Sequence, residues 1–363
     1  MFLSFDQYRP NADELMARVD ACFTDAVTGK PGHLLLRTLM PSDIALYENL
    51  KLNTFDFESE AGIERYIAEL CEEYHKSFAA REGVLDDAVL VVSPVLGIGD
   101  YSAFVAGDIA FATDTSWSKP LLAEVGDYKK LPPLGTSVWY RRFLLICEKL
   151  MSAMGDCGLP FTRGFFSPMD LAGALRGEGL YFDFYDDPDE LRGLLDYCAD
   201  ATIRFAEDIY ALAEKHLGHT KYGTFYLRNK INMSEDISCM ISGELYRTFA
   251  APATQKVIDH FGVGHMHTHS RAMYLVKEIC ALKNVANLWL ATDPNQPRPI
   301  EHIKELCADS NGVCIAIDCE NTEEIERNLD DLKHGNFSIC MPVASKEEAQ
   351  TTAARFDCYR SRG

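Results

Sequence analysis

The chain has 363 residues, of which 47% are hydrophobic and 25% are charged, and its formal net charge at pH 7 is −20. This composition is typical of a globular protein with ample material for a core. A surface of that sign is a poor match for nucleic acid, which is bound mainly through Lys and Arg, and for anionic membranes. We therefore expect a small-molecule substrate, with no nucleic-acid or membrane partner.

Twelve cysteines are scattered along the chain, and none of them forms a CxxC pair. The first residues lack the basic and apolar segments of a signal peptide. No apolar run approaches the ~20 residues of a membrane span. Free thiols without an export signal are typical of a reducing compartment, so we expect a cytoplasmic protein.

Eight segments have the pattern of short buried strands, because β-branched or aromatic residues fill them and turn residues end them. They are His33–Leu39, Ala88–Pro94, Phe161–Pro168, Gly223–Asn229, Gly264–His269, Asn287–Thr292, Gly312–Cys319 and Phe337–Val343. Helical patterns lie between them, at Phe57–Arg81, Asp187–Leu217, Ser242–Phe261, Ser270–Leu282, Pro299–Ala308, Thr322–Lys333 and Ser345–Phe356. This alternation predicts an α/β protein, a (β/α)8 TIM barrel that forms one domain over residues 1–363.

One long segment, Val95–Thr136, does not fit the alternation. It is irregular and contains several Gly and Pro residues. Loops of this length without regular structure are usually functional. We therefore expect residues 95–136 to form a cap or lid over the mouth of the barrel.

Three histidines alternate in the stretch Gly-Val-Gly-His-Met-His-Thr-His-Ser, at His265, His267 and His269. In a strand such residues point the same way, and neighbours stand about 6–7 Å apart at their backbones. The outer pair would start about 13 Å apart, so all three are poorly placed to bind one ion. The best ligand pair is therefore His267 and His269, with His265 one layer deeper.

Active sites of barrels lie where the strands end, and this rule selects further residues. Cys340 lies near the end of the eighth strand, Asp293 follows the sixth, and Glu235 and Asp236 follow the fourth. Two imidazoles and one thiolate form a sound zinc site, with the fourth position left open for chemistry. Glu235 or Asp236 would fill that position or act as an acid or base. Core packing for Cys340, helix capping for Asp293 and solvation for the two acids remain alternatives.

Several of these residues belong to motifs that resemble the uroporphyrinogen decarboxylase-like superfamily. Ser242-Gly-Glu-Leu-Tyr-Arg-Thr-Phe-Ala-Ala-Pro resembles the start of a helix in that family, and Ala174–Pro188 resembles the entry to its long helix. His267-Thr-His269 falls where the methyltransferase branch has His-x-Cys, and Cys340 falls near the last cysteine ligand of that branch. The resemblance covers about residues 155–360.

The resemblance implies a barrel and one of two chemistries, which are metal-free decarboxylation of porphyrinogen acetates and zinc-assisted methyl transfer between a corrinoid and a thiol. The first strand carries only Arg37, whereas a substrate with many carboxylates needs more cations, so true uroporphyrinogen decarboxylase activity is disfavoured. His269 stands where the methyltransferase branch has a cysteine, which leaves zinc more positive. Such an ion acidifies a bound thiol more strongly but makes its sulfur a poorer nucleophile.

The leading hypothesis is a zinc-dependent methyltransferase-like enzyme, which kinship suggests works with a separate corrinoid protein. Its site residues are His267, His269 and Cys340 for the metal, Asp236 and Glu235 for proton transfer or orientation, and Asp114, Trp117 and Asp293 for the substrate. One alternative is a metal-free decarboxylase or lyase with Asp236 or Asp114 as the proton relay. Another alternative is a protein that binds a corrinoid or another tetrapyrrole. A last one is a metal-dependent hydrolase, since the HxH motif is also typical of hydrolase barrels. In those hydrolases the motif ends the first strand, whereas here it ends the fifth.

Overall fold

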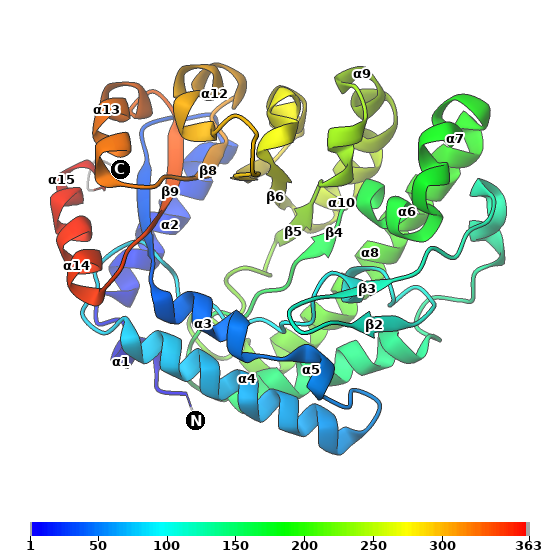
Figure 1. The fold of residues 1–363 in the computed structure, drawn as a ribbon, viewed down its shortest axis with the longest axis horizontal. Coiled ribbons are helices and arrows are strands. Elements are labelled where there is room, and N and C mark those ends of the chain that lie inside the picture. Colours follow the sequence, from blue (N-terminus) through cyan, green and yellow to red (C-terminus); the bar gives the residue numbers. More distant parts are fainter. Residues whose placement is uncertain (1, 361–363) are drawn as a thin grey trace.

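The computed structural model describes residues 2–360 and shows a curled parallel sheet with helices around its outer side (Figure 1). Seven strands follow the order β1-β9-β8-β7-β6-β5-β4. Their bounds are β1 Leu34–Leu39, β4 Phe165–Phe166, β5 Lys230–Ser234, β6 Val263–His269, β7 Val285–Ala291, β8 Cys314–Asp318 and β9 Asn336–Pro342. The alternation of strands and helices predicted from the sequence is thus confirmed as an α/β fold with a parallel sheet.

Helices connect successive strands, as a parallel sheet requires. They are α1 Phe5–Tyr8, α2 Ala12–Val27, α3 Pro41–Asn49, α4 Glu60–Ala80, α5 Val138–Met154, α6 Pro168–Arg176, α7 Leu180–Asp186, α8 Pro188–Leu217, α9 Gly243–Leu245, α10 Ala251–Phe261, α11 Val276–Ile279, α12 Ile303–Asp309, α13 Thr322–Leu332, α14 Lys346–Arg355 and α15 Asp357–Arg360. The side chains of Asn321 and Ser345 cap α13 and α14 by accepting backbone N–H groups at 3.1 and 3.2 Å. Within residues 2–360, no helix combines the length and apolarity needed to cross a membrane.

The segment predicted as the second strand lies between β1 and β4 but forms no regular strand. The Asp87 N–H donates to the Leu36 carbonyl at 2.7 Å, which joins the segment to β1. The Val92 N–H donates to the Pro160 carbonyl, and the Val92 carbonyl accepts from Thr162, both at 2.9 Å. A few separate hydrogen bonds therefore take the place of a continuous ladder here.

The side chains of two adjacent aspartates in this segment accept further backbone N–H groups of β1. Asp87 accepts from the Leu36 N–H at 2.9 Å, and Asp86 accepts from the Thr38 N–H at 2.7 Å. Burial would raise the pKa of Asp86, but the charges of Arg81 and Arg9 outweigh burial and lower it to about 2. Both arginines contact this carboxylate, at 2.6 and 2.9 Å respectively. A side-chain network thus replaces part of the ladder, which a pattern of strand residues does not reveal.

The strand predicted over Gly223–Asn229 is wrong. That segment forms consecutive turns and ends at Asn229, whose φ of 58° belongs to the left-handed region. The strand that follows is β5, with Ile231 and Met233 buried. Asn232 of β5 lines an interior cavity that the sheet encloses. Polar residues on the inward face of β5 weaken the apolar pattern by which buried strands are recognised.

The irregular segment 95–136 contains a short antiparallel hairpin, β2 Ile109–Phe111 and β3 Ser116–Ser118. Gly97, with φ of +79°, packs so closely on this hairpin that a Cβ atom there would lie 2.1 Å from the Ser116 nitrogen. The segment brings Ile98 and Tyr101 to the wall of the interior cavity.

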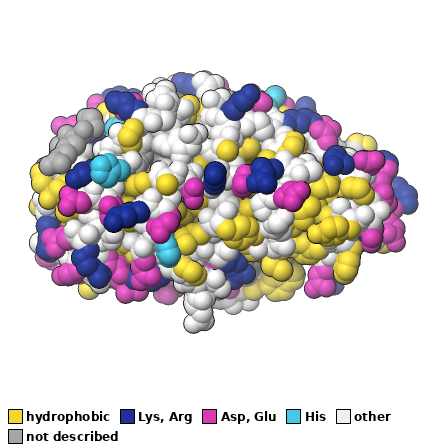
Figure 2. Space-filling view, turned by 90° about the horizontal axis from the view of Figure 1, so that it is seen from above, with side chains coloured by type: hydrophobic (Ala, Val, Ile, Leu, Met, Phe, Trp, Pro, Cys, Tyr) yellow, Lys and Arg dark blue, Asp and Glu magenta, His cyan; other side chains and the backbone are white. Residues whose placement is uncertain are grey.

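The face of the molecule in Figure 2 shows acidic, basic and apolar side chains interspersed, without a continuous basic patch among the described residues visible there. This agrees with the net charge of −20. A nucleic-acid interface of the usual basic kind is therefore not evident on this face.

Candidate metal centre

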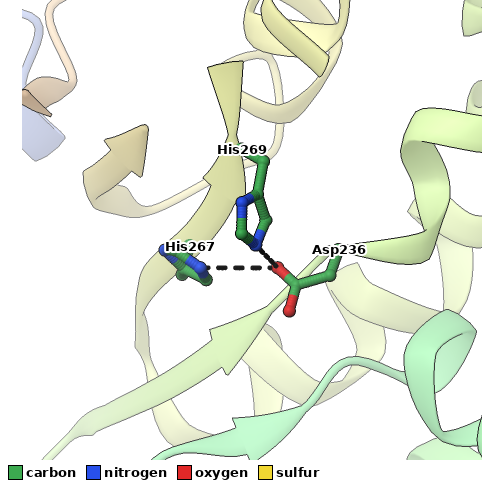
Figure 3. Close-up of side chains that lie close together, drawn as sticks. All are labelled: Asp236, His267 and His269. Atoms are coloured by element: carbon green, nitrogen blue, oxygen red, sulfur yellow. Dashed lines mark ion pairs between the residues drawn. The ribbon is translucent and has the colours of Figure 1, made fainter. Parts of the chain in front are cut away.

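Three side chains meet where β5 and β6 end: Asp236, His267 and His269 (Figure 3). The Nε2 atoms of His267 and His269 lie 3.5 and 3.6 Å from Oδ1 of Asp236. The two strands are paired neighbours with Ser234 opposite His267. The turn that follows β5 therefore carries Asp236 directly to the alternating histidines.

The spacing of these atoms suits a metal ion better than direct contact. Separations of 3.5 and 3.6 Å are too long for good hydrogen bonds. Ligand atoms bound tetrahedrally at about 2.0–2.1 Å from zinc lie roughly 3.3 Å apart. Oδ1 of Asp236 is buried and has no hydrogen-bond partner among the described residues. The donor set thus passes a simple test of fit for a divalent cation.

His269 is held from behind by a second carboxylate. Its Nδ1 donates to Oδ1 of Asp293 at 3.0 Å, while the Arg271 N–H donates to the other oxygen at 3.2 Å. Asp293 is 8% exposed. A hydrogen bond at Nδ1 leaves the Nε2 lone pair free, which is the usual arrangement of a metal-binding histidine with its supporting carboxylate. Asp293, expected as a substrate residue, is therefore placed behind His269.

The turn that carries Asp236 is fixed by Asp170, in the first turn of α6. The carboxylate of Asp170 accepts from the Ser234 hydroxyl at 2.6 Å and from the backbone N–H groups of Asp236 and Ile237, each at 2.9 Å. Asp170 is buried, and it does not belong to the three-ligand group. We infer that it is a positioning residue, which sequence reasoning missed because it lies 66 residues from Asp236.

The electrostatics of the group favour a cation. Burial, together with the negative charges of Asp170 and Glu235, raises the pKa of Asp236 well above its usual range. Burial, with a contribution from His269, lowers the pKa of His267 to about 4. His267 is therefore neutral at pH 7, the form that binds metals. A positive ion beside Asp236 would stabilise its carboxylate and offset the repulsion between the acids.

Glu235, predicted as an alternative acid or base, lies on the other side of the chain. It is fully buried and accepts hydrogen bonds from the hydroxyls of Ser167 at 3.0 Å, Ser238 at 2.8 Å and Thr254 at 3.2 Å. Its side chain does not line the interior cavity. Of the two adjacent acids, only Asp236 faces the histidines.

Cys340 is not a member of the three-ligand group, whose third ligand is Asp236. Cys340 lies on β9, which is separated from β6 by β8 and β7 in the sheet. It lines the same cavity as His267, and burial raises the pKa of its thiol. Its placement at a strand end was predicted, but distance around the sheet depends on the register and curvature of several strands. Binding of a metal by Cys340 stays a prediction.

The two cap residues predicted to contact substrate lie away from the cavity wall. Asp114 is exposed in the turn between β2 and β3, and Trp117 on β3 is 47% exposed. Neither residue lines the cavity, whereas Ile98 and Tyr101 of the same segment do. Contact of Asp114 or Trp117 with a substrate stays a prediction.

A cavity of about 730 Å³ opens beside the candidate ligands Asp236 and His267. All seven parallel strands contribute to its wall, together with the segment 87–91, and Val19 and Phe23 of α2 line it as well. A space of this size holds a small organic ligand. The structure thus describes a parallel α/β protein with a candidate centre of two histidines and one carboxylate at an internal cavity.

Comparison with known proteins supports this description at the level of the fold. No family model and no curated protein sequence matches the chain. Among the solved structures that do match is a methyltransferase from Methanosarcina mazei, with a TM-score of 0.53 over 96% of this chain and 99% of that chain. The two sequences are 12% identical, so the similarity shows a shared fold alone.

Proposed function

We propose that the protein is a metal-dependent methyltransferase that moves a methyl group between a corrinoid and a thiol-type acceptor. The observation that carries the proposal is the geometry of Asp236, His267 and His269 beside a cavity large enough for a small substrate. The shared fold with a methyltransferase supports it. In this proposal residues 86–94 act as the eighth strand of a closed (β/α)8 barrel.

The three ligands of the proposed site are Nε2 of His267, Nε2 of His269 and Oδ1 of Asp236. Two imidazoles and a carboxylate are a catalytic zinc set with an open position, and the same set also suits iron(II). A bound zinc ion would supply Lewis acidity that lowers the pKa of an acceptor thiol. The predicted set of His267, His269 and Cys340 is the competing proposal, because Cys340 lines the same cavity.

The other residues of the site hold this arrangement and shield it. Asp293 fixes the orientation of His269, and Asp170 fixes the turn that presents Asp236. The ring of Trp289 packs against the ring of His267 at 4.5 Å between centroids, which restricts its rotation. The cavity extends away from the ligands into the fold, so an acceptor can be desolvated there. A corrinoid, carried by a separate protein, would approach from the open side.

A second function is favoured by one observation. The pKa of Asp236 is raised by burial and by neighbouring acids, so without a metal this carboxyl keeps its proton near neutral pH. A protonated carboxyl at a cavity wall can donate to the carbanion that forms when a substrate loses carbon dioxide. A metal-free decarboxylase or lyase is therefore the alternative proposal.

One experiment separates the two proposals. The zinc-loaded protein is mixed with methylcobalamin and a panel of thiols, and the cobalt absorbance is followed. We expect demethylation with at least one thiol, and loss of that activity in His267→Ala and His269→Ala but not in His219→Ala, an exposed histidine paired with Asp156. No change in absorbance with any thiol would refute the methyltransferase. In a parallel assay with a panel of carboxylate substrates, carbon dioxide release that persists in His269→Ala after chelation would establish the lyase.

A further inference from the structure

The space enclosed by the sheet is hollow and partly polar, which is unusual for this architecture. Barrels of parallel strands are normally filled by layers of bulky branched side chains. Here small or polar side chains from four strands, Asn232, His265, Asn287 and Ser338, line the cavity. We call the space bordered by these four residues the inner chamber.

His265 is the main polar group of the inner chamber. Its register partners are Asn232 on β5 and Asn287 on β7. The residue is 6% exposed, and its Nε2 is buried without a hydrogen-bond partner among residues 2–360. Phe23 packs against the ring with 4.6 Å between centroids at an angle of 83°, which holds the ring in place. A buried nitrogen without a partner is costly unless a water or a ligand bonds to it.

The two asparagines beside His265 have unused capacity as well. Asn232 donates through Nδ2 to the Thr162 hydroxyl at 3.3 Å, and its carbonyl oxygen accepts no hydrogen bond from the described residues. The side chain of Asn287 makes no hydrogen bond within that part of the chain. Donors and acceptors therefore converge on the inner chamber from three neighbouring strands.

The charged groups on the cavity wall are mostly neutralised by partners within the protein. Arg81 contacts Asp43 at 2.6 Å, and Asp87 contacts Arg360 at 2.6 Å. Arg37 on β1 forms no ion pair with the described residues and lines the same cavity, but its charge acts on Cys340 and Tyr226 rather than on His265. The charge of Lys230 on β5 contributes to the lowered pKa of His265, but its ammonium donates to the Phe225 carbonyl at 2.9 Å and does not line the cavity. A charged group at His265 would therefore be desolvated without a counter-charge in direct contact, which is unfavourable.

We propose that the inner chamber is a substrate subsite that binds the uncharged, hydrogen-bonding end of a linear acceptor. His265 and His267 are two residues apart on one strand face, so their backbones are about 6–7 Å apart. An acceptor with a thiol at the metal centre and a chain of about four carbons can therefore place a terminal hydroxyl or amide at His265. The link to a metal-bound thiol rests on the proposed function, whereas the hydrogen-bonding chamber does not.

Matched thiols test the subsite in cobalt(II)-loaded protein, where thiolate-to-cobalt charge-transfer absorption reports binding. The probes are 4-mercaptobutan-1-ol, the apolar pentane-1-thiol of similar length and the anionic 4-mercaptobutanoate. We expect the alcohol to bind the native protein about five- to tenfold more tightly than the alkane, as one buried hydrogen bond allows. The preference should approach unity in His265→Phe and in Asn287→Leu, and persist in His219→Phe.

Two results would overturn the subsite. One is an unchanged preference in His265→Phe and Asn287→Leu when both variants still bind cobalt. The other is tightest binding of the anionic thiol, with the advantage lost in Arg37→Gln, which would assign the cavity to an anion. Absence of any charge-transfer band would reject the proposed function instead. In that case the melting temperature of metal-free protein tests the chamber, because butane-1,4-diol should raise it more than pentan-1-ol only while His265 is present.

Discussion

Nδ1 of His269 donates a hydrogen bond to the buried carboxylate of Asp293 across a distance of 3.0 Å. This contact decides which nitrogen of the ring is free, and the free Nε2 is the atom that faces Asp236. In the proposed site, the loop after β7 therefore orients the histidine that ends β6 toward the metal position.

Asp293→Ala should weaken zinc binding about 10- to 100-fold, because His269 loses the partner that fixes its tautomer and rotation. Competition with a chromophoric chelator measures the dissociation constant. Asp114→Ala, at an exposed aspartate in the turn between β2 and β3, is the matched control and should leave the constant unchanged. Equal zinc affinity of the Asp293 variant and the native protein would show that this hydrogen bond does not support a ligand.

Asp170→Ala should lower zinc affinity at least about tenfold although Asp170 is not itself a proposed ligand. Its carboxylate accepts the backbone N–H groups of Asp236 and Ile237, so its loss frees the turn that positions the Asp236 oxygen. Titration with zinc measures the effect, and circular dichroism checks that the fold is retained. A folded variant with native zinc affinity would exclude this positioning role.

The two proposed ligand sets differ in one residue each, and variants at those residues separate them. Asp236→Ala should retain less than ~0.2 equivalents of zinc after growth in zinc-supplemented medium, whereas Cys340→Ser should stay near one equivalent. Elemental analysis of the purified proteins gives both values. The reverse pattern would establish the sequence-based set of His267, His269 and Cys340.

Lowering the pH should weaken the contacts through which the Asp86 carboxylate joins the segment 86–94 to β1. The folded-state pKa of Asp86, about 2, lies below its unfolded value of about 3.9, so its stabilisation is complete above pH 5 and is lost as the pH falls toward 2. Asp86→Asn should lower the free energy of unfolding by about 3–5 kcal/mol at pH 7, because buried Arg9 loses the carboxylate that it contacts and Arg81 keeps only Asp43.

The difference in unfolding free energy between the native protein and Asp86→Asn should shrink by about 2 kcal/mol between pH 5 and pH 2. Urea unfolding at several pH values measures it. Asp156→Asn serves as a control, since Asp156 is exposed and its ion pair with His219 lies at the surface. A difference that stays constant with pH would contradict the assignment of a depressed pKa to Asp86.

The pairing of His267 and His269 in the candidate metal centre was predictable from the sequence because it depends on local geometry, whereas the sequence-based set completed it with Cys340 and not with Asp236. A strand places alternate residues on one face, so His267 and His269 had to share a side of β6, and the acids after the preceding strand had to lie nearby. The α/β alternation was predictable for the same reason, since each element carries its own periodicity.

The parts that the sequence did not reveal depend on distant contacts. Asp170 contacts the turn after β5 from α6, which lies far from that turn in the sequence. The position of Cys340 relative to β6 depends on how the intervening strands curve. The segment around Asp86 joins β1 largely through side chains, and β5 has polar residues facing inward. None of these arrangements leaves a regular apolar pattern in the chain.

The most direct measurement for the central claim is anomalous scattering at the zinc edge from crystals of the zinc-supplemented protein. The account predicts one peak about 2.0–2.2 Å from Nε2 of His267, Nε2 of His269 and Oδ1 of Asp236. No peak between these atoms, or a zinc ion bound elsewhere with Asp236 free of it, would contradict the account.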